Sequence, residues 1–260
     1  MRAHPEASTV VVPTYDEREN VEVLLPALLG LRPRVSVLVV DDGSPDGTGD
    51  AVEAVAAREP RVGLLRRAGK LGLGTAYVEG FARARAEGAD RVVQMDADFS
   101  HDPRDVPRLL AALGHADLVI GSRYCRGGGT RNWGLGRRLV SRGGSFYARL
   151  LLGLPVQDVT GGFKAWRAEL LRKVLRDRVR SEGYGFQIEM TLRAHRRGAR
   201  IREVPIVFED RRVGQSKMSG AIFREAVLMV PRLALSADSS LRHSPRRESL
   251  RWGPGDSRGR

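Results

Sequence analysis

The sequence lacks the features of an exported or membrane-spanning protein. Cys125 is the single cysteine, so no intramolecular disulfide can form, as is usual for proteins of reducing compartments. Residues 1–8 contain no apolar stretch of the kind found in secretory signals. No run of about 18 apolar residues occurs, and the longest late one, residues 226–235, contains Pro231 and Arg232. We therefore expect no signal peptide, no transmembrane helix and a cytoplasmic location.

Lysine is also scarce. Only four of the 44 basic residues are Lys, yet the formal net charge is +13. Such an excess indicates an anionic partner, such as nucleic acid, an acidic membrane surface or a phosphorylated substrate. The alternative explanation is compositional, because the coding bias of a GC-rich genome also favours arginine.

Aromatic residues make up only 6% of the 260 residues, and the hydrophobic content of 42% suffices for one main core. Through the first half, short apolar runs alternate with helical patterns. This alternation predicts a mostly parallel, Rossmann-like α/β sheet flanked by helices, whose ligands bind beyond the carboxyl ends of the strands. The predicted strands are residues 8–12, 35–40, 62–65, 91–95 and 117–121, and the predicted helices are residues 20–31, 48–58, 75–87 and 104–113.

The second half is less regular. After a glycine-rich loop at residues 127–129, the pattern predicts helices at 137–152, 168–175 and 186–197, an extended segment at 157–167 and a strand at 201–208. From Ser236 the chain consists mainly of Ser, Arg, Pro and Gly, which predicts a disordered tail. The expected organisation is a flexible N-terminus (1–7), one domain (8–220), an amphipathic helix (221–235) and a disordered basic tail (236–260).

The sharpest chemical signal is the sequence Asp96-Ala97-Asp98, which follows a predicted buried strand. Two carboxylates at this spacing can share a hard divalent cation, which prefers oxygen ligands. Such a cation would bridge diphosphate oxygens and stabilise a departing nucleoside diphosphate. Two solvated loop acids are the alternative. His101 follows the motif and is expected to face solvent.

Polar residues follow two earlier strands as well. Asp41 and Asp42 end the second predicted strand, where a carboxylate can accept hydrogen bonds from ribose or a base edge. Alternatively, Asp41 or Asp46 only caps the next helix. Tyr15 and Glu17 follow the first strand and could hold a nucleobase, although Pro-Thr-Tyr is also an ordinary turn.

Two further features are less specific. Residues 69–75 form a glycine-rich loop that opens a helix, but they match neither common phosphate-binding pattern, so proximity to phosphate is only one interpretation. Arginine binds phosphate in bidentate fashion, and a set of basic residues in the second half could hold a diphosphate or a lipid phosphate. This set comprises Arg123, Arg137, Arg138, Arg211, Arg212 and Lys217.

In combination these motifs resemble the dolichol-phosphate mannosyltransferases, whose bacterial members are polyprenol monophosphomannose synthases. The segments that carry the resemblance are VPTYDEREN at 12–20, DDGSPDGT at 41–48, KLGLGTAY at 70–77 and MDAD at 95–98. The similarity extends over residues 10–217. It implies a GT-A fold and an enzyme that transfers mannose from GDP-mannose to a polyprenol (dolichol-type) phosphate with inversion, using Mg²⁺ or Mn²⁺.

The resemblance also implies roles for individual positions. The guanosine-binding set is Pro13, Tyr15, Glu17, Val40 and Asp42. Asp96, Ala97 and Asp98 match the diphosphate and metal motif, with Asp98 as the main metal ligand and Asp96 as the second. Arg211 and Lys217 match a loop that closes over the donor, and Arg123, Arg137 and Ser141 match positions for the acceptor phosphate. Asp98, Arg123, Arg211 and Lys217 form the expected catalytic set. Some relatives place a Gln ligand where this chain has Ser100, so a ligand from that position is in doubt.

The family's acceptor is a lipid, so the resemblance places the enzyme peripherally on the cytoplasmic face of an anionic membrane, and a membrane-protein partner fits the same picture. The predicted helix 221–235 either lies in the interface or packs on the domain. Two other functions remain open, namely glucosyl transfer from a UDP-sugar to the same acceptor and a non-enzymatic polyanion-binding module. Nucleic acid is not the expected partner, because a polyanion module leaves the strand-end acids unexplained.

Overall fold

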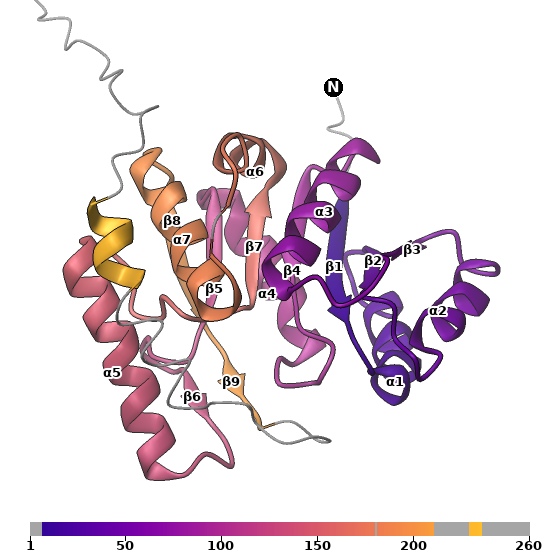
Figure 1. The fold of residues 1–260 in the computed structure, drawn as a ribbon, viewed down its shortest axis with the longest axis horizontal. Helices are drawn as coiled ribbons and strands as arrows, with labels where there is room; N and C mark the ends of the chain where they lie inside the picture. Colours follow the sequence, from indigo (N-terminus) through magenta and orange to yellow (C-terminus); the bar gives the residue numbers. More distant parts are fainter. Residues whose placement is uncertain (1–6, 180, 211–228, 236–260) are drawn as a thin grey trace, which may run out of the picture.

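The computed structural model describes residues 7–179, 181–210 and 229–235. Within them, seven strands form one sheet in the order β3-β2-β1-β4-β7-β5-β8 (Figure 1). All its pairings are parallel except those of β7, which runs antiparallel to both neighbours. The predicted mostly parallel sheet is confirmed. The strands are β1 (Ser8–Thr14), β2 (Ser36–Asp41), β3 (Val62–Arg66), β4 (Arg91–Gln94), β5 (Leu118–Ser122), β7 (Lys164–Arg167) and β8 (Ile201–Pro205).

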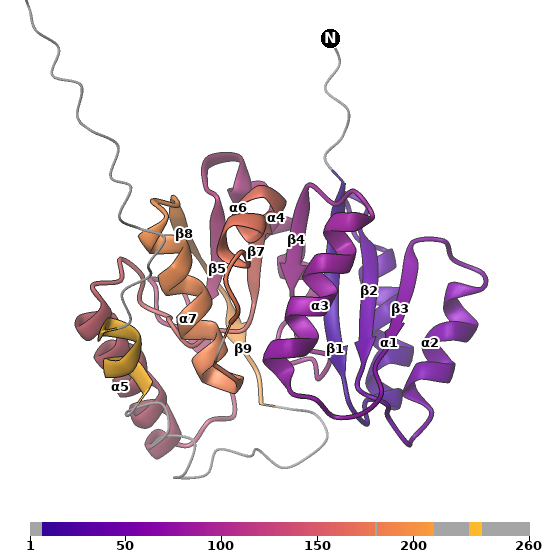
Figure 2. The ribbon, with the colours of Figure 1, turned by 45° about the horizontal axis from the view of Figure 1, so that its top comes forward.

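Helices cover both faces of this sheet (Figure 2). Side chains alternate along a strand, so Val10 and Val12 of β1 pack with one core cluster and Val11 with the other. The first face is covered by α1 (Arg18–Leu29), α2 (Thr48–Ala56) and α4 (Val106–Ala112), the last flanked by the short turns η1 (Pro103–Asp105) and η2 (Leu113–His115). The second face is covered by α3 (Leu73–Ala86), α6 (Ala168–Val174) and α7 (Gly183–Arg196), with α5 (Leu135–Leu152) beside them.

Two predicted strands differ from those in the structure. Of the extended segment 157–167, only Lys164–Arg167 forms a strand, and it enters the sheet between β4 and β5. The predicted strand 201–208 divides at Ile206, whose side chain is buried in the core. Beyond it, β9 (Val207–Phe208) pairs with β6 (Gly129–Thr130) in a separate small sheet. The division brings Phe208 over the ends of the central strands.

The C-terminal prediction lies partly outside the described residues. Residues 229–235 are helical, and Met229, Val230 and Leu233 pack against the core cluster that contains α7. Arg196 of α7 donates hydrogen bonds to the carbonyl groups of Leu233 and Ala234. This end of the segment therefore packs on the domain, whereas residues 221–228 and the predicted tail 236–260 lie outside the described part. None of the described helices is long and apolar enough to cross a bilayer.

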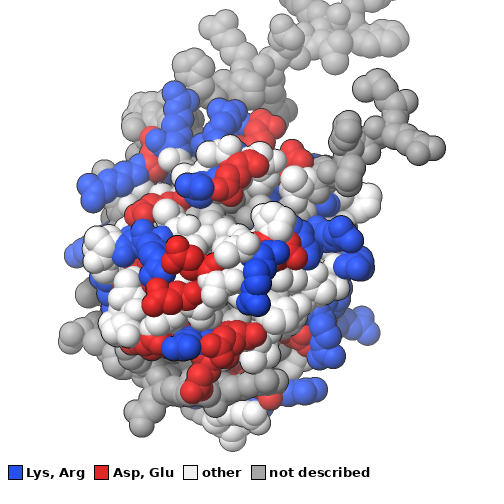
Figure 3. Space-filling model, turned by 90° about the vertical axis from the view of Figure 1, so that its right-hand side faces the viewer, with Lys and Arg blue, Asp and Glu red and all other residues white. Residues whose placement is uncertain are grey.

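Charged side chains of both signs intermingle on the face of the molecule toward α2. Figure 3 shows blue and red residues interspersed there. Arg66 of β3, for example, pairs with Asp50 and Glu53 of α2 at 2.6 and 2.7 Å. The charge of Arg66 is therefore balanced by its neighbouring carboxylates.

Candidate active site

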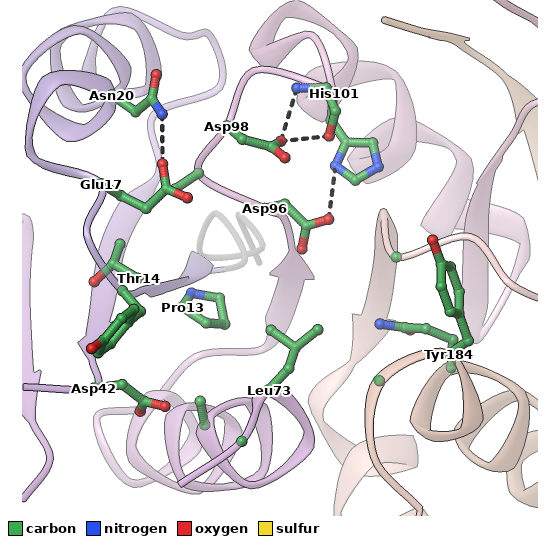
Figure 4. Close-up of a pocket in the computed structure, with 18 of the residues that line it drawn as sticks. Pro13, Thr14, Glu17, Asn20, Asp42, Leu73, Asp96, Asp98, His101 and Tyr184 are labelled. Atoms are coloured by element: carbon green, nitrogen blue, oxygen red, sulfur yellow. Dashed lines mark hydrogen bonds and ion pairs between the residues drawn. The ribbon is translucent and has the colours of Figure 1, made fainter. Parts of the chain in front are cut away.

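A cavity of about 1100 Å³ opens beyond the carboxyl ends of β1, β2 and β4. The segments that follow these strands line one side, and residues of α5, α7 and β9 line the other. In Figure 4, side chains from several of these elements point into the shared space. The predicted convergence of polar residues at the strand ends is therefore observed. Those that line the cavity include Pro13, Tyr15, Glu17, Asp42, Asp96, Ala97, Asp98, Arg123 and Arg137.

The acidic motif is held in place by neighbouring side chains. Asp96 accepts a hydrogen bond of 2.9 Å from the hydroxyl of Tyr77. Burial and the Asp96 charge raise the pKa of Tyr77 well above its usual range, so the phenol remains a donor. One oxygen of Asp98 accepts hydrogen bonds from the backbone N–H and the hydroxyl of Ser100, at 3.0 and 2.6 Å. Ser100 thus orients Asp98.

His101 corrects a prediction, because it does not face solvent. Its ring is buried, stacks on Phe163 and meets Phe208 edge-on, with centroid distances of 5.0 and 5.2 Å. Its Nδ1 lies 3.9 Å from an Asp96 oxygen (Figure 4). Burial lowers the pKa of His101 although nearby carboxylates act to raise it, so the ring is neutral near pH 7. The local sequence gave no sign that β9 would cover this loop.

The two acids that end β2 have different roles. Asp41 turns away from the cavity and accepts hydrogen bonds from Thr14 and from the backbone and hydroxyl of Ser44. Asp42 lines the cavity and forms a buried ion pair with Arg67 at 2.5 Å. Asp46 accepts hydrogen bonds from the backbone N–H and hydroxyl of Thr48, at 2.9 and 2.6 Å. Asp46 therefore binds the first residue of α2 from the position before the N-cap, which is Gly47 and has no side-chain cap, and Asp42 is the strand-end acid that lines the cavity.

The loop after β1 forms the neighbouring wall. The ammonium group of Lys70 lies 3.9 Å from the centre of the Tyr15 ring. Glu17 accepts a hydrogen bond of 2.5 Å from the Asn20 amide. An aromatic ring and a carboxylate therefore line the cavity together with Asp42, in the part predicted to hold a nucleoside.

Arg123 and Arg137 form a basic wall of the cavity, and both side chains are held by partners within the protein. Arg123 forms two hydrogen bonds of 2.7 Å with the buried carboxylate of Asp158 and one of 2.8 Å with Thr160. Arg137 pairs with Asp210 at 2.7 Å and lies 4.1 Å from the Trp133 ring centre. Both guanidinium groups line the cavity, so they can contact an anionic ligand while their own counter-ions hold them rigid.

Residues 9–175 match the model of a family described as Glycosyl transferase family 2. The chain belongs to this family. It is 50% identical over 227 residues to the undecaprenyl-phosphate mannosyltransferase of Micrococcus luteus, covering 87% of this chain and 93% of that protein. It is 45% identical over 227 residues to the polyprenol monophosphomannose synthase of Mycolicibacterium smegmatis, covering 86% of each. These relatives confirm the family recognised from the motifs.

A solved structure gives the same fold. The glucosyl-3-phosphoglycerate synthase from Mycobacterium tuberculosis, in complex with Mn²⁺, uridine diphosphate and glucosyl-3-phosphoglycerate, matches with a TM-score of 0.67 at 25% identity. The match covers 90% of this chain and 82% of that one. The GT-A fold and the assignment as a glycosyltransferase are therefore confirmed.

Some predicted site residues of this family 2 glycosyltransferase do not reach the cavity. The Val40 side chain is buried in the core, so only its backbone could approach a donor. Ser141 accepts a hydrogen bond of 2.7 Å from Tyr124 and is absent from the cavity wall. Arg211 and Lys217 lie outside the described residues, as does Arg212. The roles of these positions remain predictions.

The glycine-rich loop has an unexpected partner. The α3 N-terminus, which an anion could occupy, is filled by the carboxylate of Glu182, which accepts a hydrogen bond of 3.0 Å from the backbone N–H of Gly74. In the structure this position holds a protein carboxylate and not an open phosphate site. Glu182 is 108 residues away in sequence, so no local pattern could have revealed it.

Other cavity residues of the glycosyltransferase carry no local signal either. Trp133, Thr160, Tyr184 and Gln187 all line the cavity, but each lies in an ordinary helix or loop of the sequence. Only the resemblance to a family could have directed attention to the segments that contain them.

Proposed function

We propose that this glycosyltransferase moves mannose from GDP-mannose to the phosphate of a polyprenol phosphate. The products are polyprenyl β-mannosyl phosphate and GDP, formed with inversion. The observation that carries the proposal is the 50% and 45% identity to an undecaprenyl-phosphate mannosyltransferase and a polyprenol monophosphomannose synthase, over 93% and 86% of their lengths.

The geometry of the cavity supports two anionic substrates. Tyr15 and Asp42 would receive the nucleoside, and Asp96 and Asp98 its diphosphate. Arg123 and Arg137 on the basic wall would receive the acceptor phosphate. Because that phosphate is already anionic near neutral pH, its attack requires no strong general base. The protein's own contribution is then alignment of the two substrates by rigid groups.

The acidic motif also fits a divalent cation. Among the described residues there is no cluster of three or more His, Cys, Asp or Glu side chains that could hold a metal. One or two carboxylates nevertheless commonly bind Mg²⁺ when substrate phosphates and water complete its coordination shell. The Mycobacterium tuberculosis relative holds Mn²⁺ with its nucleotide. Asp96 and Asp98 would hold Mg²⁺ or Mn²⁺, which would stabilise the negative charge of the departing GDP.

Helix α5 supports action at a membrane surface. Leu135, Leu139, Phe146 and Leu150 lie on one face of this helix and are 77%, 73%, 62% and 73% exposed. A second face carries the exposed residues Arg138, Arg142 and Arg149. An apolar face beside a basic one is typical of helices that lie in an anionic membrane interface.

The same helix contributes residues both to this surface and to the cavity. Arg137 of α5 lines the cavity, two residues before the exposed Leu139. Because residues two apart in a helix point in nearly opposite directions, Arg137 faces away from the apolar face, and the polyprenyl chain of an acceptor bound at Arg137 would pass around α5 to reach it. We therefore propose peripheral attachment to the cytoplasmic face of a membrane through α5, and a membrane-protein partner remains a further prediction.

The proposal is tested by incubating the protein with radiolabelled GDP-mannose and polyprenyl phosphate in vesicles, with EDTA as a control. We expect a mannolipid that is labile to mild acid and is absent with EDTA. UDP-glucose is tested in parallel. Turnover of UDP-glucose without turnover of GDP-mannose would instead establish a glucosyltransferase.

A further inference from the structure

A row of buried polar side chains lies beneath the acidic motif. It runs from Lys164 on β7 through Gln187 on α7, Gln94 on β4 and Tyr77 on α3 to Asp96. Gln187 Oε1 accepts hydrogen bonds from Gln94 at 2.7 Å and from Lys164 at 3.1 Å. The Tyr77 hydroxyl, whose pKa burial raises and Gln94 acts to lower, donates a hydrogen bond to Asp96 at 2.9 Å. We call these five residues the buried polar row.

Lys164 has no carboxylate within ion-pairing distance among the described residues, which is costly for a buried amine. An ammonium group has three N–H donors, and all three partners of Lys164 belong to α7. They are the backbone carbonyl and the side-chain oxygen of Gln187, at 2.8 and 3.1 Å, and the Thr191 hydroxyl at 3.0 Å. Lys164 therefore fixes both the backbone and the side chain of Gln187.

These contacts determine which end of the Gln187 amide faces the cavity. Because Oε1 accepts two hydrogen bonds from inside the protein, the NH₂ group is the opposite end of the amide. Gln187 lines the cavity, and its Nε2 lies 3.6 Å from the position that a Cβ on Gly162 would occupy. An oxygen of Asp96 lies 3.4 Å from the same point. The cavity wall over Gly162 thus presents a neutral donor beside a carboxylate acceptor.

A sugar hydroxyl matches this pair better than a phosphate does. A hydroxyl both donates and accepts, so it can bond Asp96 and the Gln187 amide directly and together, whereas a phosphate oxygen only accepts and can approach the Asp96 carboxylate only through a bridging cation. The position of the Asp96–Gln187 pair agrees with the order of nucleoside, diphosphate and hexose in a sugar nucleotide. In Figure 4, Asp96 lies between Glu17 on the nucleoside side and Tyr184, which begins the turn of α7 that contains Gln187. If the diphosphate binds at the acidic motif, the hexose extends toward α7.

We propose that the side-chain NH₂ group of Gln187 donates a hydrogen bond to a hydroxyl of the transferred hexose and thereby determines sugar specificity, with Lys164 and Gln94 as positioning residues. The inference rests on the proposed function, since it assumes a nucleotide-linked hexose in this cavity. It assigns a role to a residue that neither the motifs nor the acid and arginine geometry had identified.

The first test replaces Gln187 by Glu, which keeps an oxygen for Lys164 and Gln94 but removes the NH₂ donor, and separately by Met. Each variant is assayed with GDP-mannose and with GDP-mannose analogues that lack one hydroxyl at a time. For the wild type, removal of the contacted hydroxyl should lower kcat/KM by about 10-fold or more. In both variants, the analogue that lacks the contacted hydroxyl should react as well as GDP-mannose itself. For the other analogues, the loss in kcat/KM relative to GDP-mannose should be the same as in the wild type.

Affinity for GDP, measured by calorimetry, should change less than threefold in both variants, because GDP has no hexose. Gln157→Glu is the matched control, since Gln157 is exposed and lies outside the cavity wall. It makes the same chemical change and should leave all parameters unaltered. Equal losses with every analogue, or a parallel loss of GDP affinity, would overturn the assignment.

The positioning role is tested with Lys164→Met. If Lys164 acts through Gln187, this variant should lose discrimination at the same hydroxyl, and combining it with Gln187→Met should cause no additional loss. A variant that is less stable but keeps the wild-type analogue profile would show that Lys164 is only structural. If the wild type does not use GDP-mannose, the proposed function fails. The analogue series is then repeated with the sugar nucleotide that the wild type does use, and the same two outcomes decide the role of Gln187.

Discussion

At the scale of single residues, Asp98 is the side chain on which the proposed metal-assisted transfer would depend. It is nearly buried, and Ser100 fixes one of its oxygens. Asp98→Asn keeps an oxygen for Ser100 but removes the negative charge. We expect transfer to fall by at least about 100-fold, since a bound cation contributes several kcal/mol to transition-state stabilisation. The thermal midpoint should change by only a few degrees. Near-normal transfer in this variant would contradict the metal site.

Substitution of Arg123 tests acceptor binding less directly than the sequence suggested, because Arg123 also neutralises Asp158. Arg123→Ala leaves a buried carboxylate without its partner, which we expect to cost about 3–5 kcal/mol of unfolding free energy. Urea titration measures this loss. Replacing both residues by apolar side chains of similar volume should restore part of the stability without restoring transfer. If Arg123→Ala is as stable as the wild type, the pair contributes nothing to the fold.

Lys164 predicts a pH dependence of stability. Burial lowers the pKa of Lys164 from 10.5 to about 7, although Asp158 acts to raise it. Between these two values the unfolded chain binds more protons than the folded one, so stability rises with pH in this window. Relative to Lys164→Met, the free energy of unfolding of the wild type should rise by up to about 1.4 kcal/mol per pH unit between pH 7 and 9. Below pH 6 the difference should be constant. If the difference in unfolding free energy between the two proteins does not change with pH, the pKa of Lys164 is not lowered in the folded state.

At the scale of elements, α5 is distinctive because only Ser145 and Ala148 among its 18 residues are buried. The helix remains attached through Ser145, which bonds Thr160 at 3.1 Å, and through Ala148, which packs in the core. Its outer face therefore contributes little to the fold of the isolated domain and is available to a partner.

The apolar face of α5 predicts vesicle binding. Replacing Leu139, Phe146 and Leu150 together by Ser should reduce co-sedimentation with anionic vesicles by about 10-fold or more, since each buried apolar side chain contributes roughly 1.5–3 kcal/mol. Transfer to a water-soluble, short-chain polyprenyl phosphate should be retained. Val23→Ser is the control, because Val23 is an apolar residue on α1 that is also more than half exposed (56%) and lies outside α5. Unchanged sedimentation of the triple variant would exclude α5 as the membrane-binding element.

At the scale of the whole molecule, the cavity is assembled from both halves of the chain, and the contact between Glu182 and Gly74 joins them across 108 residues. A ligand that bridges the halves should therefore stabilise the folded state as a unit. At a concentration of 100 times its Kd, a ligand adds about 2.7 kcal/mol, or roughly 5–10 °C in a chain of this size.

GDP together with Mn²⁺ should produce this shift in a thermal melt, and EDTA should remove most of it. In Asp98→Asn, the part of the shift that requires Mn²⁺ should disappear while GDP alone still has a small effect. An equal shift with and without metal in the wild type would indicate that GDP binds independently of the cation.

The sequence alone was sufficient for the features governed by local pattern. Apolar runs gave most strands and helices to within a few residues, and the rule that ligands bind at the carboxyl ends of parallel strands placed Asp42, Asp96 and Asp98 at the cavity. These results depend on neighbours in the chain, whose periodicity the sequence displays directly. The family was also determined at this level, because several motifs occurred together in the right order.

Only the tertiary structure decided which distant groups meet. The burial of His101 depends on Phe208, the fixed position of Arg123 on Asp158, and the orientation of Gln187 on Lys164. Each pair is separated by more than 20 residues, and β7 joins the sheet antiparallel although the strands before it are parallel. Such contacts follow from how the packed layers fit together and from the need of every buried polar group for a partner. Neither condition can be read from one segment of the chain, which is why the acids were predicted from the sequence and the residues that orient them were not.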